Sequence, residues 1–378
     1  MTAKVELEAA LRRALALAPT HRFRVLPNPR VGAVVLDRTG TVVGEGATEP
    51  YGGKHAEIVA LEAAGELARG GTLVSTLEPC AHERKKTPPC APAIVRAGIA
   101  RVLSGCADPN PATAGQAAAL FAEQGIEVLA SPLPAECAAQ IARYARHLGA
   151  GVPWTIGKWA MSADGRTADD DHASRWITGP ASRRSVHAVR GRVEAVVVGV
   201  DTVLADDPSL TCRESEGSDP IRVVFDSRLR MPLETQLVQT ARQTPTWVVT
   251  CEGHGETADR LRGAGVEVVA VAPAANGRVD PRAAFEELHA RGIRRLLCEG
   301  GGTLLAGLWG AGLVHQVMAF VAPMVIGGIH GPRPFSGPGF GMHAAPRLEE
   351  PSWAVLANDA LLEAFVPPLA AESTSSIE

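Results

Sequence analysis

The chain has 378 residues, of which 46% are hydrophobic and 21% are charged, and its formal net charge is −4. This balance excludes a disordered chain, and the net charge provides no basic field that would attract nucleic acid, so we expect no nucleic-acid partner. The length favours two domains, and no apolar run approaches the roughly 20 residues of a bilayer span, so we expect no membrane partner. The odd count of 7 cysteines is typical of a protein from a reducing cytoplasm.

The first half of the sequence predicts strands that alternate with helices. Residues 1–15 have the pattern of an amphipathic helix in which Glu8 and Arg12 form a pair one turn apart. The patterns that follow predict a hairpin, a helix from His55 to Gly65 and a strand that ends at Pro79. Three more predicted helices and two more predicted strands complete the first half, and the last helix covers residues 134–148. We therefore expect a three-layer α/β domain over residues 1–149.

The second half predicts another α/β domain, over residues 150–369. Gly and Pro residues at 147–154 mark the boundary between the two domains. We expect residues 370–378 to form a frayed tail. The predicted strands are 154–162, 193–200, 221–226, 246–250, 266–271, 293–299 and 315–327, and helical patterns fill several of the intervals between them.

One histidine and two cysteines of the first half have the pattern of a catalytic zinc site. His55-Ala56-Glu57 opens the predicted helix, Glu78-Pro79-Cys80 ends a strand and Cys90 opens another helix. Zinc deaminases combine an H-x-E helix with a P-C turn, which gives three protein ligands and one open position. Zinc lowers the pKa of water at that position, and a carboxylate that is not a ligand then transfers protons. Glu57 is suited to this second role.

Two other interpretations of these residues stay open on the sequence. Cys80 and Cys90 could form a disulfide, or His82 could be a fourth ligand of a closed structural site. A closed site could not activate water, because it has no open position.

Four segments carry a resemblance to a known family: Pro27–Pro29, His55–Glu57, Glu78–Cys90 and Asp108–Pro111. Together they resemble the bifunctional deaminase/reductase of riboflavin biosynthesis, whose first domain has a cytidine-deaminase-like fold. The resemblance implies that zinc is bound by His55, Cys80 and Cys90, and that Glu57 transfers protons. It also implies that the pyrimidine or its ribose phosphate contacts Asn28, His82, Lys86, Asp108 and Asn110.

The chain departs from this family at two places near the predicted site. Nine residues separate Cys80 from Cys90 where the family usually has eight, and Arg84-Lys85-Lys86 replaces a glycine-containing turn. One extra loop residue costs little closure entropy, so the zinc site should be retained. A substrate-contacting histidine of the family is Thr48 here, and its hydroxyl can donate a hydrogen bond but cannot carry charge.

A glycine-rich turn, Glu299–Thr303, connects a strand to a helix in the second half. Backbone N–H groups at such a turn can bind a phosphate, although the turn lacks the spacing of a dinucleotide-binding Rossmann motif. The segments 158–167, 174–178 and 199–211 are similar to the reductase domain of the same family, which resembles dihydrofolate reductase and uses NADPH. The resemblance thus covers roughly residues 5–365.

Matching positions one by one, the resemblance implies two sets of residues in the second domain. The NADPH site would be lined by Met161, Trp176, Thr202, Asp206, Ser227, Gly301, Gly302, Thr303, Leu304, Leu305, Ala306 and Gly307. The substrate would contact Ser174, Arg190, Leu210, Arg213 and Glu299, and Lys158 could transfer a proton. Forked arginine donors suit a ribose phosphate.

The resemblance implies two successive reactions in one cytoplasmic, homo-oligomeric enzyme that associates through its reductase domains. Zinc hydroxide would deaminate 2,5-diamino-6-ribosylamino-4(3H)-pyrimidinone 5′-phosphate, and NADPH would then reduce ribosyl C1′ of 5-amino-6-(5-phosphoribosylamino)uracil to the ribitylamino product. Three alternatives are an enzyme with one inactive domain, a nucleic-acid deaminase, and a zinc-stabilised binding module without activity.

Overall fold

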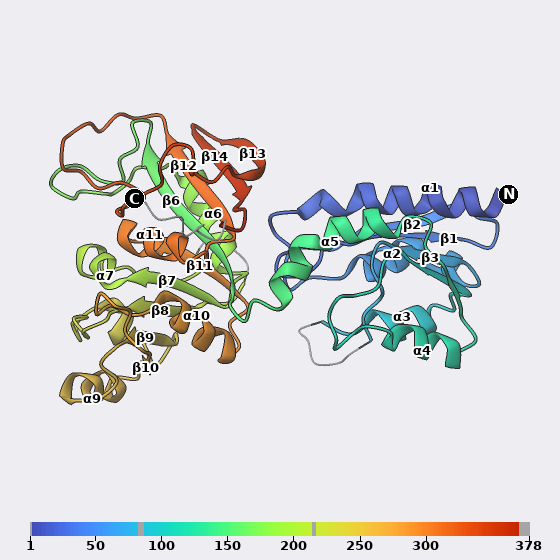
Figure 1. Cartoon of the computed structure of the whole chain (residues 1–378), viewed down its shortest axis with the longest axis horizontal. Coiled ribbons are helices and arrows are strands. Elements are labelled where there is room, and N and C mark those ends of the chain that lie inside the picture. The colour runs from blue at the N-terminus through green and yellow to red at the C-terminus, as the bar shows by residue number, and fades with distance from the viewer. Residues whose placement is uncertain (1, 82–86, 214–216, 370–378) are drawn as a thin grey trace, which may run out of the picture. The chain divides into compact units, whose positions relative to one another are not determined.

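The computed structural model describes residues 2–81, 87–213 and 217–369 (Figure 1). The chain divides into two units, Met1–Ala150 and Gly151–Glu378. Among the described residues, none of the helices has the length and apolar character that a membrane crossing requires.

The first unit contains a five-stranded mixed sheet of order β2-β1-β3-β4-β5. The hairpin expected from the sequence is present, with β1 antiparallel to β2, and β1 is also antiparallel to β3. The remaining neighbours, β3 with β4 and β4 with β5, are parallel. The strands are β1 (Gly32–Leu36), β2 (Val42–Ala47), β3 (Thr72–Ser75), β4 (Arg101–Ser104) and β5 (Glu127–Leu129).

Helices cover both faces of this sheet, which confirms the predicted three layers. The buried side chains of α2, α3 and α4 pack on one face, with Leu73 and Val102 at the centre of that core. Those of α1 pack on the other face against Val34, Val74 and Leu103. Figure 1 shows α1 and α5 on one side and α3 and α4 on the other. The helices are α1 (Thr2–Leu17), α2 (Ala56–Ala64), α3 (Cys90–Arg96), α4 (Gln116–Glu123) and α5 (Pro134–Leu148), with short 3-10 helices at Ala18–His21 and Gly65–Ala68.

Two glycines of β2 set the position of α2, which carries the H-x-E motif. A Cβ atom on Gly44 would lie 2.2 Å from the carbonyl oxygen of Ala60, and one on Gly46 would lie 2.4 Å from that of Ala56. Any side chain at these positions would push the helix off the sheet, because no atom fits at such distances. The N-terminal turn of α2 is therefore held in a fixed place relative to the end of β3.

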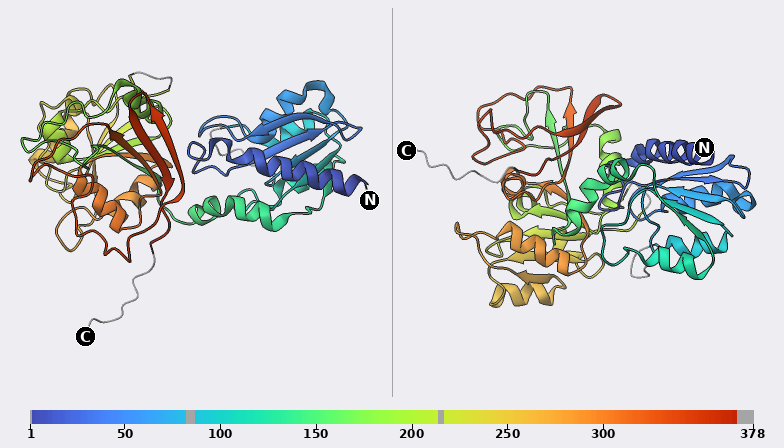
Figure 2. Two further views of the ribbon diagram at one scale, coloured as in Figure 1. Left: turned by 90° about the horizontal axis from the view of Figure 1, so that it is seen from above. Right: turned by 45° about the vertical axis from the view of Figure 1, so that its right-hand side comes forward.

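The second unit contains a nine-stranded sheet of order β10-β9-β8-β7-β11-β6-β12-β14-β13. The first seven strands in this order, from β10 at the edge to β12, run parallel to one another. The last two, β14 and β13, continue the sheet as an antiparallel hairpin (Figures 1 and 2). The strands are β6 (Trp154–Ser162), β7 (Ala195–Gly199), β8 (Ile221–Phe225), β9 (Thr246–Thr250), β10 (Glu267–Ala270), β11 (Arg295–Gly300), β12 (Gln316–Ala322), β13 (Glu349–Leu356) and β14 (Asp359–Phe365).

Most strands predicted for the second half are present, and the structure differs from the prediction at two places. The strand predicted over 315–327 ends at Ala322, because Pro323 follows and Gly327 and Gly328 have positive φ values. The hairpin of β13 and β14 was not predicted from the sequence. The helices are α6 (Pro180–Arg190), α7 (Val200–Asp206), α8 (Gln236–Gln239), α9 (Glu256–Gly263), α10 (Pro281–Ala290) and α11 (Gly302–Gly310).

Candidate active sites

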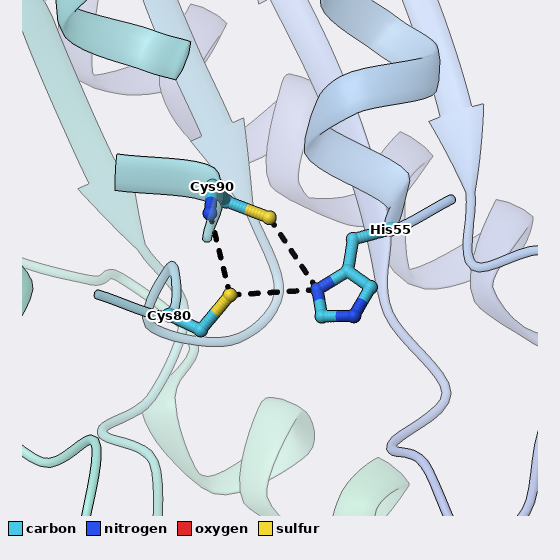
Figure 3. Close-up of side chains that lie close together, drawn as sticks. All are labelled: His55, Cys80 and Cys90. Carbon is cyan, nitrogen blue, oxygen red and sulfur yellow. Dashed lines mark hydrogen bonds between the residues drawn. The ribbon is translucent and has the colours of Figure 1, made fainter. Parts of the chain in front are cut away.

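Three side chains of the first unit converge at the N-terminal ends of two helices (Figure 3). His55 is the N-cap residue of α2, Cys90 is the first residue of α3, and Cys80 lies on the turn that follows β3. Nδ1 of His55 lies 3.5 Å from Sγ of Cys80 and 3.4 Å from Sγ of Cys90. The three ligand atoms all lie within 4.8 Å of one another, and both cysteines are buried.

The donor atoms fit a tetrahedral zinc ion. Zinc bonds of about 2.0–2.1 Å to nitrogen and about 2.3 Å to sulfur place the two ligand atoms roughly 3.5 Å apart at a tetrahedral angle. Nε2 of His55 lies 3.1 Å from Oγ1 of Thr87, a contact that leaves Nδ1 for the metal. The backbone N–H of Cys90 donates to Sγ of Cys80 over 3.4 Å, which favours a thiolate there.

The two alternative interpretations of this cluster have different outcomes. The disulfide interpretation is wrong, because Cys80 and Cys90 are both free cysteines. Within the described ranges, the cluster has three members and so leaves the fourth position of a tetrahedron open. His82, the candidate fourth ligand, and Lys86 both lie outside the described residues.

Glu57, Asn28 and Thr48 differ in their burial and in their backbone surroundings. Glu57 is in the first turn of α2, one residue into the helix that His55 caps, and is only 3% exposed. Asn28 lies on the loop before β1 and is half-buried, with its N–H donating to the carbonyl oxygen of Val25. Thr48 is buried, and its Oγ1 accepts a hydrogen bond from the Val31 N–H over 3.2 Å. This hydroxyl is thus engaged with the β1–β2 hairpin.

The predicted substrate loop, Asp108–Pro111, is held by Glu78, the first residue of the E-P-C motif, and by Tyr144, which no sequence motif singled out. Glu78 accepts hydrogen bonds from the N–H groups of Asp108 and Gly115, over 3.3 and 2.8 Å. Oδ1 of Asp108 accepts from the Tyr144 hydroxyl over 3.1 Å and from the N–H of Asn110 over 2.9 Å. Burial and the Asp108 carboxylate raise the pKa of Tyr144, so its hydroxyl stays protonated and donates to Asp108.

Replacing Tyr144 by Phe tests this support. We expect the KM of the deamination substrate to rise severalfold, because a buried carboxylate loses a donor and hydrogen bonds to charged groups contribute about 1.5–3 kcal/mol. The zinc content should not change. Steady-state ammonia release gives KM and kcat separately, and reduction by the second unit of the same chain is the internal control. A fall in kcat with unchanged KM would contradict a positioning role.

The second unit has an open cleft of about 790 Å³ at the carboxyl ends of its parallel strands. Such strand ends are where α/β sheets usually bind ligands. Sequence-predicted residues that line the cleft are Lys158, Ser174, Trp176, Arg190, Thr202, Asp206, Leu210, Arg213, Glu299, Gly301, Gly302 and Leu305.

Six predicted cofactor residues are not part of the lining formed by the described residues: Met161, Ser227, Thr303, Leu304, Ala306 and Gly307. Met161 lies on β6, and the last four lie on α11 behind the glycine-rich turn. The side chain of Ser227 accepts a hydrogen bond from the N–H of Val279 over 3.0 Å.

A buried cluster of three charged side chains lies at the inner end of the cleft. Arg190 donates to both oxygens of Glu299, over 2.5 and 3.0 Å, and Nζ of Lys158 lies 3.9 Å from Oε2 of Glu299. Burial acts to raise the pKa of Glu299, but the two cations outweigh it and the pKa is lowered. Burial lowers the pKa of Lys158, with Glu299 opposing the shift and Arg190 adding to it. The cluster thus combines a stable carboxylate with a lysine that gives up its proton more readily than usual.

An exposed indole stands at the mouth of the cleft. Trp176 is 67% exposed, and the guanidinium of Arg183 lies over its ring, 4.6 Å from the centroid. Arg183 also donates to the carbonyl oxygen of Thr178 over 2.8 Å. On the facing side, Ser174 donates to Asp206 over 3.3 Å. Arg183 thus covers one face of the indole ring, and an aromatic face of this kind is a surface on which a heteroaromatic ring can stack.

Several lining residues were not predicted from the sequence. His187 of α6 and the segment Pro332–Pro334 were absent from the motifs, although both line the cleft. A helical histidine three residues before Arg190 lies on the same helix face, which is a signal the sequence did contain. Nothing in the sequence indicated that Pro332–Pro334, part of a glycine- and proline-rich segment after β12, reaches the cleft.

Both halves of the chain match family models. A model described as "RibD C-terminal domain" matches residues 153–362, and one described as "Cytidine and deoxycytidylate deaminase zinc-binding region" matches residues 4–106. The chain is 38% identical over 357 residues to "Riboflavin biosynthesis protein RibD" of Actinobacillus pleuropneumoniae, covering 94% of each chain. It is 37% identical over 333 residues to the Mycobacterium tuberculosis protein of that name, covering 86% of this chain and 88% of the relative.

Solved structures agree along nearly the whole length. RibD of Acinetobacter baumannii superposes with a TM-score of 0.71 at 31% identity, covering 96% of this chain and 99% of the other. A diaminohydroxyphosphoribosylaminopyrimidine deaminase/5-amino-6-(5-phosphoribosylamino)uracil reductase from Thermotoga maritima superposes with a TM-score of 0.70 at 31% identity and the same coverage. The chain therefore belongs to the RibD family of bifunctional riboflavin-biosynthesis enzymes, which join a zinc-dependent pyrimidine deaminase to an NADPH-dependent reductase.

Proposed function

We propose that the first unit deaminates the diaminopyrimidinone ribose phosphate through the three residues of the cluster and Glu57. His55, Cys80 and Cys90 would hold zinc, which when bound supplies a water of lowered pKa. The carboxylate of Glu57 would take one proton from that water and deliver it to the ring nitrogen. A second proton, from the hydroxyl then bonded to the ring carbon, would pass through Glu57 to the departing ammonia. Its burial removes competing solvent from the path of the proton.

The remaining predicted deaminase residues orient the substrate in this proposal. Asp108 and Asn110 lie on a loop whose backbone Glu78 holds at two N–H groups, so their positions do not depend on the substrate. Asn28 contributes an amide that can both donate and accept a hydrogen bond with the pyrimidine edge. We also propose that His82 and Lys86 contact the pyrimidine or its ribose phosphate, as the family match implies.

The second unit would reduce ribosyl C1′ of the deaminated product inside the cleft. NADPH supplies the hydride. Arg213 binds the ribose phosphate, Glu299 and Ser174 hold the sugar hydroxyls, and Leu210 packs against the substrate. Lys158 delivers a proton to the sugar as the ring opens, a role to which its lowered pKa is suited. Arg190 donates from Nε and Nη2 to Glu299 and from Nη1 to the carbonyl oxygen of Thr211, which supports a role in orienting the carboxylate.

The predicted cofactor residues fall into two groups, those that line the cleft and those that do not. Trp176, Thr202, Asp206, Gly301, Gly302 and Leu305 line the cleft beside the glycine-rich turn. Met161, Ser227, Thr303, Leu304, Ala306 and Gly307 stay a proposal that rests on the family match alone.

The observation that carries the proposal is the three-ligand cluster with a buried glutamate one residue into the helix that His55 caps. The test is incubation of the chain with the pathway pyrimidine, with and without NADPH, followed by mass analysis. We expect oxygen to replace one amino group without NADPH, and two hydrogens to be added only with it. Unchanged substrate in both reactions would contradict the proposal, whereas deamination without reduction would indicate an inactive second unit.

We further propose a cytoplasmic homo-oligomer that associates through its reductase units. The seven thiols support a reducing compartment. On the edge strand β13, Trp353 and Val355 are 65% and 77% exposed. Edge strands with exposed apolar side chains pair readily with another chain.

Replacing Trp353 by Lys should therefore lower the molar mass in solution, measured by light scattering during gel filtration, because a charge at an apolar interface opposes association. The matched control is Val128→Lys, on the edge strand β5 of the deaminase unit, which should leave the mass unchanged. A monomeric wild-type chain would contradict the proposal.

A further inference from the structure

The glycine- and proline-rich connection after β12 is held to the second unit by hydrogen bonds along residues 326–336, here called the strap. Asp164 accepts hydrogen bonds from the N–H groups of Ile326 and Gly327, over 3.1 and 2.8 Å. Asp170 accepts from three consecutive N–H groups, those of residues 329–331. The buried Arg166 donates to the carbonyl oxygens of Gly331 and Gly328. The strap is therefore a built part of the fold.

The far end of the strap packs on the glycine-rich turn. Phe335 contacts both Trp159 of β6 and Trp309 of α11 edge-on, each with 5.3 Å between ring centroids. The N–H of Ser336 donates to the carbonyl oxygen of Gly302 over 3.1 Å. A Cβ atom on Gly302 would lie 2.7 Å from the carbonyl oxygen of Arg333, so a glycine at this position permits the contact. As a result, Pro332, Arg333 and Pro334 form a wall of the cleft beside residues 300–302.

The other cations of the cleft are largely committed to protein partners. Glu299 engages Arg190 and Lys158. Arg175 and Arg183 donate to the carbonyl oxygens of Asp206 and Thr178. Among the residues that the structure describes, two arginines of the lining form no ion pair or hydrogen bond through their guanidinium groups: Arg213 and Arg333.

These two arginines belong to different walls, and the reaction has two phosphate-bearing ligands. Arg213 follows Leu210 on the loop that lies against α6, where its own N–H donates to His187. Arg333 lies against the turn whose N–H groups open α11. A glycine-rich turn that leads into a helix N-terminus attracts phosphate, and an arginine beside it adds charge-assisted donors.

We propose that Arg333 binds the pyrophosphate of NADPH, so that the strap supplies the cationic half of the cofactor site and the glycine-rich turn supplies the N–H half. This inference rests on the proposed position of the cofactor at the turn. It assigns to the strap a function in cofactor affinity, separate from substrate binding at Arg213.

The experiment measures the Kd of NADPH on the full chain, by energy transfer from protein tryptophans to the reduced nicotinamide. We expect Arg333→Ala to raise the Kd about tenfold or more, the usual effect of losing a charge-assisted hydrogen bond, and Arg333→Lys to restore part of it. The KM of the pyrimidine substrate and the rate of ammonia release should not change. Arg347→Ala is the matched control, because Arg347 is exposed on the same connection between β12 and β13, outside the strap, and is not part of the cleft lining formed by the described residues.

A second titration with NADH separates the phosphates of the cofactor. A pyrophosphate contact predicts the same fold loss for NADPH and NADH, because both carry that group. A loss confined to NADPH would place Arg333 at the 2′-phosphate and overturn the assignment, as would an unchanged Kd. A wild-type chain that failed to bind NADPH would instead contradict the reductase function itself.

Discussion

Replacing Glu57 by Gln is expected to abolish deamination while the zinc site survives. The amide keeps nearly the same shape, so the N-terminal turn of α2 and the position of His55 should not change. It cannot accept a proton from water, and general acid–base catalysis typically contributes 10²–10⁴-fold, so ammonia release should fall by about three orders of magnitude. Ammonia release on the purified protein and metal analysis of the same sample measure the two effects.

A matched variant on the same helix controls for the chemical change. Glu62→Gln alters an exposed glutamate of α2 that pairs with Lys54 over 2.6 Å, and such surface pairs contribute only about 0–1 kcal/mol. We expect full deamination and full zinc content for this variant. Loss of zinc from the Glu57 variant would make Glu57 part of the metal site, and retained activity would support a zinc site without a catalytic glutamate.

Reduction should be intact in the Glu57 variant when the deaminated pyrimidine is supplied directly. The two activities lie in separate units of the chain, each with its own sheet. Loss of both activities together would therefore indicate that the variant is misfolded. Its loss of deamination would then no longer support a catalytic role for Glu57.

Local pattern was sufficient to predict the cluster around His55. Proline and cysteine at a strand end, a histidine at a helix start and a second cysteine at another helix start each fix the backbone position of a ligand. The same local signals predicted three layers in the first unit and most strands of the second. These predictions succeeded because a helix or strand boundary is decided by residues that are neighbours in the sequence.

Features that depend on tertiary pairing could not be predicted in this way. Arg190 and Glu299 meet across 109 residues because β11 lies between β6 and β7 in the sheet. Tyr144 reaches Asp108 from the last helix of the first unit, and no motif marks it. The hairpin of β13 and β14 was missed because Pro351 interrupts β13, and its mostly exposed side chains give no clear burial pattern. The strap is held by the carboxylates of Asp164 and Asp170, which accept from backbone N–H groups about 160 residues further along the chain, and local sequence patterns do not indicate partners so far apart.

The buried charge cluster of the reductase unit leads to the second large effect. With Glu299 in place, its carboxylate raises the pKa of Lys158 against the opposite effect of burial. Replacing Glu299 by Gln removes that negative charge and leaves Arg190 beside the lysine, so the pKa of Lys158 should fall further. The protonated fraction of Lys158 then decreases at neutral pH, and the lysine can no longer serve as an acid.

We therefore expect the Glu299→Gln chain to lose reduction by about two orders of magnitude or more, while ammonia release is unchanged. The alkaline limb of its residual pH–rate profile should move to lower pH than in the wild type. The reductase unit should also unfold more easily, by on the order of 3 kcal/mol, because breaking a buried ion pair leaves cations without compensation. NADPH oxidation across pH and thermal unfolding measure these effects.

The control for this variant is Glu267→Gln, which removes a carboxylate from a surface arginine, Arg291, in the same unit. It should leave both the rate and the pH profile at wild-type values. If the Glu299 variant lost activity while its alkaline limb stayed in place, the carboxylate would act on the substrate alone and Lys158 would not be the acid. A limb that moved to higher pH would contradict the electrostatic coupling, since losing a nearby negative charge can only make a lysine easier to deprotonate.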